Sequence, residues 1–286
     1  DVGGTKVAAG LVDDAGAILS TARRPTPAAD ADAVLALVAD VVDELAGATA
    51  EPVVGVGVGV AGPVDGQRST VYFAPNLQWH QVPAREVLQK ATGLPVVIEN
   101  DGNIAAWGEY RFGAGRGAGD LTLVTVGTGI GGGLILDGRL HHGASDVAGE
   151  IGHTTIETSG RRCKCGNYGC LEAYASGPAI AERAREALMG GAPSLLRDAA
   201  GGDLAALTAQ HVYEGAAQDD DIAREVWAQS IVPVSSLVAP QQFLREQQFT
   251  RHVSIEGTVH FEDALAACGH VLQGNAACCL IAPATP

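Results

Sequence analysis

The hydrophobic positions of the first hundred residues follow two periods. Apolar residues recur with helical spacing at 32–46 and stop at Gly47, which predicts a helix. Valine and glycine alternate at 53–60, which predicts a strand whose glycines allow close approach of another backbone or a ligand. A short helix over 83–93 and a buried strand at 95–98 are expected next. Helices and strands therefore alternate, as in an α/β protein.

A strand, a glycine-rich turn and a returning strand occur twice, at 1–12 and at 121–138. Before the second copy, 113–120 is glycine-rich and polar and is the best candidate linker. The repetition suggests two related halves that face a cleft. Helical segments are then expected over 171–190, with a break at its Ser-Gly-Pro sequence, and over most of 204–230.

Composition limits the classes of function. The chain has 286 residues, of which 47% are hydrophobic and 18% charged, enough for one large or two modest packed domains. Eighteen Lys and Arg against 33 Asp and Glu give a formal charge of −15, which disfavours nucleic acid as a partner. No 18-residue apolar run or leader occurs, so we expect a cytoplasmic protein with no membrane partner. Because Asp1 looks like the end of a strand, we expect that preceding residues are missing.

The first glycine turn carries groups that suit phosphate. Glycines expose backbone N–H groups, a threonine adds a hydroxyl, a lysine adds positive charge, and an aspartate could bind Mg²⁺ through water. These residues are Asp1, Gly3, Gly4, Thr5 and Lys6. A lone turn of this kind is more often an ordinary hairpin, and it lacks the P-loop spacing. A second glycine turn favours phosphate binding over an ordinary hairpin, since two turns could clamp a polyphosphate. The residues of this second turn are Gly127, Thr128, Gly129, Gly131, Gly132 and Gly133.

Polar residues Glu99-Asn100-Asp101 follow the strand predicted at 95–98, and a helix is expected over 104–112. The carboxyl end of a strand is where α/β proteins usually bind ligands. Asp101 could accept the proton of an attacking hydroxyl while Asn100 orients a sugar. The position of Asp101 alone suits a helix N-cap better, but the neighbouring segments favour the catalytic interpretation.

Three cysteines lie within eight residues, at Cys163, Cys165 and Cys170. Such a cluster in an intracellular protein indicates a metal site first, and loop thiols without metal are the alternative. The nearest upstream histidine, His153, would complete a Cys₃His set for Zn²⁺. A closed four-ligand site leaves no position for water, so the zinc would be structural. It would fix the loop bearing two carboxylates suited to sugar hydroxyls, Glu150 and Glu172.

Other polar clusters carry less chemistry. The cysteines at 268, 278 and 279 lack metal spacing and are interpreted as buried apolar fillers or incidental thiols. The run Asp219-Asp220-Asp221 is interpreted as a solvated helix start.

Taken together, these residues resemble the ROK family of bacterial sugar kinases and related repressors, and most of all its glucokinases. The likeness runs from residue 1 to about 230. The cysteine motif with its upstream E-x-G-H is highly specific, while the glycine turns are weak singly and strong as a pair. The segments that carry the likeness are DVGGTK at 1–6, GVGVAGPVDG at 57–66, APNLQW at 74–79, ENDGN at 99–103, GTGIGGG at 127–133, EIGH at 150–153 and CKCGNYGCLE at 163–172.

The resemblance implies an actin/hexokinase-like fold of two ribonuclease-H-like domains, which we expect at 1–116 and 117–286. It implies ATP-dependent phosphorylation of a hexose, most simply glucose, with Mg²⁺ and a structural Zn²⁺. Asp101 would be the base toward the 6-hydroxyl, and the two glycine turns would bind the ATP phosphates. Homo-dimers or homo-tetramers are common in the family. The sugar would also contact Gly62, Asn76, Asn100, Glu150, His153 and Glu172.

The last segment departs from the family pattern. A buried strand and a Gly-Gly turn that packs on the adenosine are expected soon after Pro240, but 241–248 reads QQFLREQQ. We therefore expect a divergent or out-of-frame tail over 240–286, with weak nucleotide affinity or poor folding as the consequence. Alternatives remain a sugar-sensing repressor of the same family, a catalytically inactive sugar-binding module, polyphosphate as the donor, and fructose, mannose, allose or N-acetylmannosamine as the sugar.

Overall fold

The computed structural model describes residues 1–27, 30–238, 252–254, 258–259 and 278–284. The chain forms two compact units, each described below by itself. Unit 1 comprises Asp1–Phe112 and Leu140–Ala148, and unit 2 comprises Gly113–Arg139 and Gly149–Pro286. The segment 140–148 thus belongs with unit 1 although it lies beyond the candidate linker in the sequence. The division into domains 1–116 and 117–286 stays a prediction.

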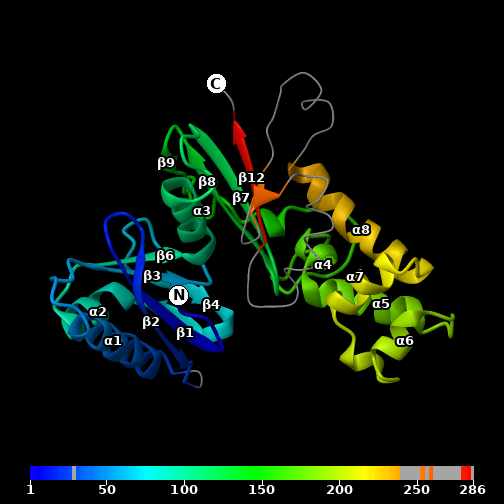
Figure 1. The fold of residues 1–286 in the computed structure, drawn as a ribbon, viewed down its shortest axis with the longest axis horizontal. Coiled ribbons are helices and arrows are strands. Elements are labelled where there is room, and N and C mark those ends of the chain that lie inside the picture. Colours follow the sequence, from blue (N-terminus) through cyan, green and yellow to red (C-terminus); the bar gives the residue numbers. More distant parts are fainter. Residues whose placement is uncertain (28–29, 239–251, 255–257, 260–277, 285–286) are drawn as a thin grey trace. The chain divides into compact units, whose positions relative to one another are not determined.

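Unit 1 combines three strand pairs with three helices (Figure 1). Two of these pairs are connected through Val2, which bridges to Val7 of the first pair and to Val60 of the parallel pair. Strands β1 and β2 pair antiparallel, β3 and β6 pair parallel, and β4 and β5 pair antiparallel. The elements are β1 (Lys6–Val12), β2 (Ile18–Pro25), α1 (Ala31–Gly47), β3 (Val56–Val60), β4 (Val71–Ala74), the 3₁₀ turn η1 (Pro75–Leu77), β5 (Trp79–Val82), α2 (Ala84–Thr92), β6 (Val96–Asn100) and α3 (Asp101–Phe112).

Local signals explain where these helices begin and end. The Asp30 side chain accepts from the N–H groups of Asp32 and Ala33 and caps α1. Helix α2 ends at Gly93, whose left-handed backbone terminates it. Helices α1 and α2 lie side by side (Figure 1) and bury apolar residues, including Leu35 and Leu88, in the core of the unit. The helices predicted at 32–46, 83–93 and 104–112 are confirmed.

The alternating valines and glycines of 53–60 do form a strand, β3, and only some of its glycines are needed for close packing. A Cβ on Gly59 would lie 3.2 Å from the Ile104 side chain and 3.8 Å from Asp101 Cα. At Gly57 a Cβ would meet nothing within 4 Å. Gly59 therefore lets the start of α3 pack closely on β3.

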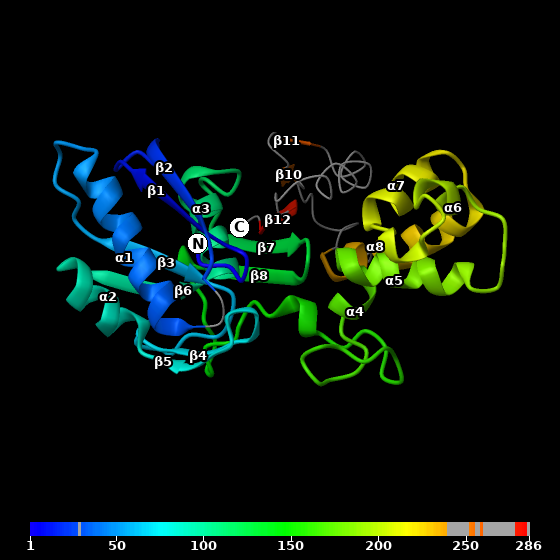
Figure 2. The same cartoon turned by 90° about the horizontal axis from the view of Figure 1, so that it is seen from below.

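Unit 2 contains a sheet and a group of helices, which Figure 2 shows around α5 and α7. The sheet order is β11-β10-β12-β7-β8-β9. The helical core includes Ile180, Leu196 and Val212. The elements are β7 (Asp120–Val126), β8 (Ile130–Leu136), β9 (Arg139–Leu140), η2 (Ile151–His153), α4 (Glu172–Ala175), α5 (Gly177–Leu188), α6 (Leu195–Ala199), η3 (Leu204–Ala206), α7 (Ala209–Ala217), α8 (Asp221–Val238), β10 (His252–Ser254), β11 (Thr258–Val259) and β12 (Cys278–Ala284).

Most of the pattern predicted for this half is confirmed. Strands β7 and β8 are connected by a glycine turn, as predicted for 121–138. Ser176 separates helix α4 from helix α5, as predicted for the break in 171–190. The aspartate run does mark the start of α8, but the expectation of solvation is wrong for Asp220, which is buried. Its carboxylate is drawn inward by hydrogen bonds from Leu195 and Ala223 N–H groups, at 2.7 and 2.9 Å.

Strand β12 is a feature that the sequence pattern missed. It pairs antiparallel with β7 from Cys278 opposite Val126 to Ala284 opposite Asp120. Pro283 and the alanines of this segment weaken the strand signal, because proline is rare inside sheets. The prediction for the side chains of the cysteines at 268, 278 and 279 falls outside what the structure describes. The predictions for the segment after Pro240 and for the rest of the tail, apart from β10, β11 and β12, also fall outside the described residues.

Candidate functional site

The junction between β6 and α3 positions Asp101. The residue is the first of α3 and keeps an exposed surface. Its Oδ1 accepts a hydrogen bond from the N–H of Gly102 at 2.9 Å. The protein atoms crowded around the carboxyl group raise its pKa above the ordinary value of 3.8, because desolvation disfavours the charged form. A raised pKa and an accessible carboxylate are properties of a general base.

The side chain of Asn100, not that of Asp101, caps α3. Asn100 Oδ1 accepts from the Asn103 N–H at 3.1 Å, the bond that an N-cap side chain makes. Asn100 Nδ2 donates to the Gly62 carbonyl at 3.3 Å. The capping interpretation of Asp101 is thereby weakened, since its neighbour satisfies the helix start. Gly62 and Asn100, both predicted to bind sugar, lie side by side.

The first glycine turn packs on another predicted residue. Gly3 N–H donates to Lys6 O at 3.0 Å, and the Thr26 hydroxyl donates to Gly3 O at 2.6 Å. A Cβ on Gly4 would lie 2.7 Å from the carbonyl oxygen of Asn76, so only glycine fits there. The structure thus brings the turn that contains Asp1, Thr5 and Lys6 next to the η1 turn.

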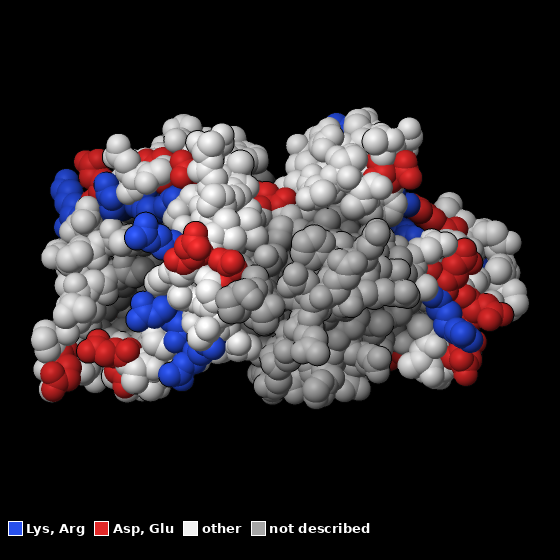
Figure 3. Space-filling view, turned by 90° about the horizontal axis from the view of Figure 1, so that it is seen from above, with Lys and Arg blue, Asp and Glu red and all other residues white. Residues whose placement is uncertain are grey.

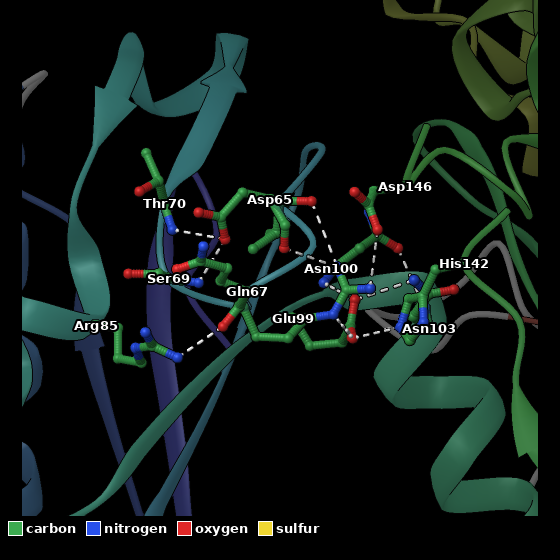
Figure 4. A network of polar contacts seen from close by, with 12 residues as sticks. Asp65, Gln67, Ser69, Thr70, Arg85, Glu99, Asn100, Asn103, His142 and Asp146 are labelled. Atoms are coloured by element: carbon green, nitrogen blue, oxygen red, sulfur yellow. Dashed lines mark hydrogen bonds and ion pairs between the residues drawn. The ribbon is translucent and has the colours of Figure 1, made fainter. Parts of the chain in front are cut away.

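A buried carboxylate beside the candidate base was not singled out from the sequence. Glu99, 8% exposed, contacts side chains from three segments of unit 1 (Figure 4). Its Oε2 lies 2.9 Å from His142 Nε2 and 3.2 Å from Arg68 Nε. Its Oε1 accepts from Asn103 Nδ2 at 3.0 Å. The sequence signal for this residue was a glutamate at the end of a buried strand. Its partners Arg68 and His142 lie 31 and 43 residues away in the chain, so local spacing did not reveal them.

Unit 2 carries the predicted metal ligands. One ligand atom from each of His153, Cys163, Cys165 and Cys170 lies within 4.8 Å of the others. The Sγ atoms of Cys165 and Cys170 are 3.7 Å apart, and His153 Nδ1 is 3.8 Å from Cys163 Sγ. Tetrahedral Zn²⁺ with Zn–S bonds of about 2.3 Å needs sulfur atoms about 3.8 Å apart. The donor set and its spacing therefore fit a zinc site.

The thiols of this cluster influence one another. Burial raises the pKa of the Cys163 thiol to about 12. Burial also tends to raise the pKa of the Cys165 thiol. Hydrogen bonds from the Asn167 N–H and the neighbouring thiols outweigh this effect and bring that pKa below the ordinary value. A bound cation would favour the thiolate form of all three cysteines.

Glu150 and Glu172 each lie beside one residue of the metal-type cluster. His153 turns Nδ1 toward the thiols, while its Nε2 lies 3.9 Å from Glu150 Oε2. Glu172 Oε1 lies 3.9 Å from Cys163 Sγ, and Glu172 Oε2 accepts from the Ile130 N–H at 2.9 Å. The second bond links the cysteine loop to the glycine turn at 127–133, a connection that sequence spacing did not reveal.

The candidate residues therefore form one group in each unit. Asp101, Asn100, Gly62, Asn76 and the first glycine turn belong to unit 1. Glu150, His153, Glu172, the cysteines and the second glycine turn belong to unit 2. The expectations that both glycine turns bind one polyphosphate, and that both groups contact one hexose, stay predictions.

The described surface and helices bear on possible partners. Figure 3 shows acidic and basic side chains interspersed among the described residues of one face, without a broad basic stripe. Among the described helices, none combines the length and the hydropathy of a membrane span.

Comparison with known proteins identifies the family. A family model described as ROK family matches residues 1–249, which is most of the chain. The chain belongs to the ROK family. The family expected from the sequence motifs is confirmed, and so is the mixed α/β, actin-like fold.

Individual relatives of this ROK chain include kinases and a regulator. It is 48% identical over 186 residues to a glucokinase of Streptomyces coelicolor, covering 65% of this chain and 58% of that protein. A solved ROK family glucokinase from Streptomyces griseus, in complex with glucose and AMPPNP, is 39% identical with a TM-score of 0.67, covering 82% of this chain and 78% of that one. A xylose repressor of Caldicellulosiruptor bescii is 42% identical over 154 residues, 53% of this chain and 39% of the repressor. The ROK chain thus spans less than two thirds of the curated glucokinase's length.

Proposed function

We propose that this protein transfers the γ-phosphoryl group of ATP to the primary hydroxyl of a hexose, and that the hexose is glucose. The observation that carries the proposal is the carboxylate of Asp101, an exposed residue at the β6–α3 junction, with a raised pKa and with Asn100 beside it. The relatives named glucokinase, one of them solved with glucose and AMPPNP, support the substrate pair.

Asp101 acts as the base in this reaction. The hydroxyl proton becomes acidic only as oxygen bonds to phosphorus, so the position of the carboxylate matters more than a large pKa shift. Asn100 is restrained by its bonds to Gly62 and Asn103, and it presents a preorganised amide next to the base. Phosphoryl transfer then depends on positioning and on stabilisation of charge.

The phosphates of ATP are bound by the two glycine turns. Backbone N–H groups at 1–6 and 127–133, the Thr5 and Thr128 hydroxyls and the Lys6 ammonium group supply donors. Asp1 would hold Mg²⁺ through water, and the ion would offset the negative charge of the phosphates. With a formal charge of −15, the chain depends on such local donors to attract a polyanion.

Zinc would be held by His153, Cys163, Cys165 and Cys170, whose spacing fits it. When bound, it cross-links the loop and keeps the thiols ionised. His153 would hold the metal through Nδ1, which lies on the side of the thiols, and its Nε2, beside Glu150, could contact a sugar hydroxyl together with that carboxylate. Glu172, whose Oε1 lies 3.9 Å from Cys163 Sγ, supplies another carboxylate beside the cluster.

The runner-up function is sugar sensing in a transcriptional repressor. It is favoured by the match to a xylose repressor, which covers 53% of this chain. The phosphate-type residues Asp1–Lys6 favour the kinase, since a sensor of sugar alone has no use for them. The two functions differ in whether ATP is consumed.

A coupled kinase assay tests the proposal. Glucose, fructose, mannose, allose and N-acetylmannosamine are each offered with ATP or with polyphosphate. Glucose with ATP should give the highest kcat/KM, and Asp101→Asn should lower kcat by about 10²–10⁴-fold while glucose binding stays within a few fold. Sugar binding without phosphorylation of any hexose would favour the sensor or an inactive sugar-binding module. Light scattering checks the expected dimer or tetramer.

A further inference from the structure

The segment 140–148 leaves unit 2 and returns to it. Residues on both sides of it, up to Arg139 and from Gly149, belong to unit 2, whereas 140–148 packs with unit 1. We call this segment the strap. Directly after the strap come Gly149 and Glu150, and Gly149 has a left-handed backbone with φ of 91°. A residue that binds the strap to the rest of unit 1 therefore holds the stretch of chain that directly precedes Gly149 in the sequence.

Two polar contacts fasten the strap, one near each end. His142 Nε2 lies 2.9 Å from Glu99 Oε2, and Arg68 Nη2 lies 3.2 Å from Asp146 Oδ1. This contact is a hydrogen bond between the imidazole ring and the carboxyl group. Arg68 Nε also lies 3.2 Å from Glu99 Oε2, which joins both contacts into one cluster.

The same carboxylate holds the catalytic junction. Glu99 Oε1 accepts from the Asn100 N–H at 2.9 Å and from Asn103 Nδ2 at 3.0 Å. Figure 4 shows the contacts of Glu99 with Asn103 at the start of α3 and with His142. Its two oxygens therefore face different structures, one the backbone that carries Asp101 and the other the strap.

The backbone around the cluster supports a dedicated role. Arg68 and Asp146 both have left-handed φ values, 55° and 57°, which are unfavourable for an arginine in particular. A Cβ on Gly66 would lie 3.1 Å from Asp146 Oδ2, so the turn before Arg68 approaches the strap closely. Glu99 itself is buried, and a buried carboxylate is retained only with several partners.

We propose that Glu99 is a positioning residue that couples the strap, through His142 and Arg68, to the β6–α3 junction that carries Asn100 and Asp101. This inference rests on the proposed function, because the group it positions is the proposed base. Displacement of a catalytic group by about 1 Å can cost about 10²-fold in rate. Loss of the Glu99 charge should therefore lower turnover more than it weakens hexose binding.

The first experiment compares Glu99→Gln with Glu86→Gln, the same chemical change at an exposed site on α2 of the same unit. We expect Glu99→Gln to lower kcat by about tenfold or more, to raise the hexose KM by less than about threefold, and to speed amide exchange in the strap. The exchange of Ala148, whose N–H donates to His142 O at 3.0 Å, is a direct reporter. Equal kcat and equal exchange in the two variants would overturn the proposal.

A second comparison serves if Glu99→Gln fails to fold. His142→Ala removes the donor to Glu99, whereas His142→Gln keeps an N–H group on a side chain of similar reach. Faster strap exchange and lower kcat in the alanine variant, with recovery in the glutamine variant, support the coupling. The same values in both histidine variants contradict it. If the wild type phosphorylates no hexose, the proposed function fails, and the exchange measurements alone still decide whether Glu99 and His142 fasten the strap.

Discussion

Asp220 offers a quantitative test of how the helical part of unit 2 is stabilised. Its carboxylate accepts from Leu195 N–H at 2.7 Å, Ala223 N–H at 2.9 Å and Ser194 Oγ at 3.0 Å. In Asp220→Asn, an amide nitrogen replaces one acceptor, which leaves a buried donor without its bond. That loss costs about 1–3 kcal/mol, and the missing charge at the start of α8 costs about 0.3–1 kcal/mol more. We expect about 2 kcal/mol of destabilisation, or a Tm lower by roughly 4–8 °C.

The neighbouring Asp219→Asn is the matched control, since the Asp219 side chain is 87% exposed in its ion pair with Arg224. It should change stability by less than about 0.5 kcal/mol. Burial opposes ionisation of Asp220, but its hydrogen bonds, led by that from Ala223, bring the pKa below the ordinary 3.8. A depressed pKa in the folded state means that the stabilisation is complete above the ordinary value and is lost as pH falls through the folded pKa. Urea unfolding at pH 7 and pH 3 measures both effects, and equal stabilities of the two variants at pH 7 would refute the reasoning.

Three further predictions concern the site. The raised pKa of Asp101 places the acidic limb of kcat/KM above pH 3.8, with activity lost as pH falls and the base becomes protonated. A limb that persists unchanged in Asp101→Asn would assign it to another group. Removal of zinc by a chelator should lower Tm and hexose affinity together, and mass spectrometry should find one zinc per chain in the wild type and less in Cys165→Ser. Gly62→Ala places a Cβ 2.1 Å from the Phe73 carbonyl oxygen and should destabilise unit 1 by about 1–3 kcal/mol. Gly57→Ala, whose Cβ would have nothing within 4 Å, should not destabilise it, and the urea midpoints of the two variants distinguish these outcomes.

The local elements were predictable because their signals lie within a few residues. The helical stripe of α1, the glycine that ends α2 and the unit of β7, glycine turn and β8 depend on periodicity and on turn chemistry. The cluster of His153 and the three cysteines was predictable for the same reason, since three cysteines within eight residues have few uses other than a metal site in such a protein. By contrast, β12 was missed because a proline and alanines give a weak strand signal, while its pairing with β7 depends on residues about 150 positions earlier.

Within the site, the sequence by itself determined which kinds of chemistry are present: a carboxylate after a buried strand, two glycine turns and a Cys₃His set. The tertiary structure decided which groups share a contact. It assigned the helix cap to Asn100, linked Glu172 to Ile130, buried Asp220, and placed Glu99 between Arg68 and His142. These outcomes depend on contacts between residues far apart in the chain and on the desolvation that accompanies them, and neither is encoded in local spacing.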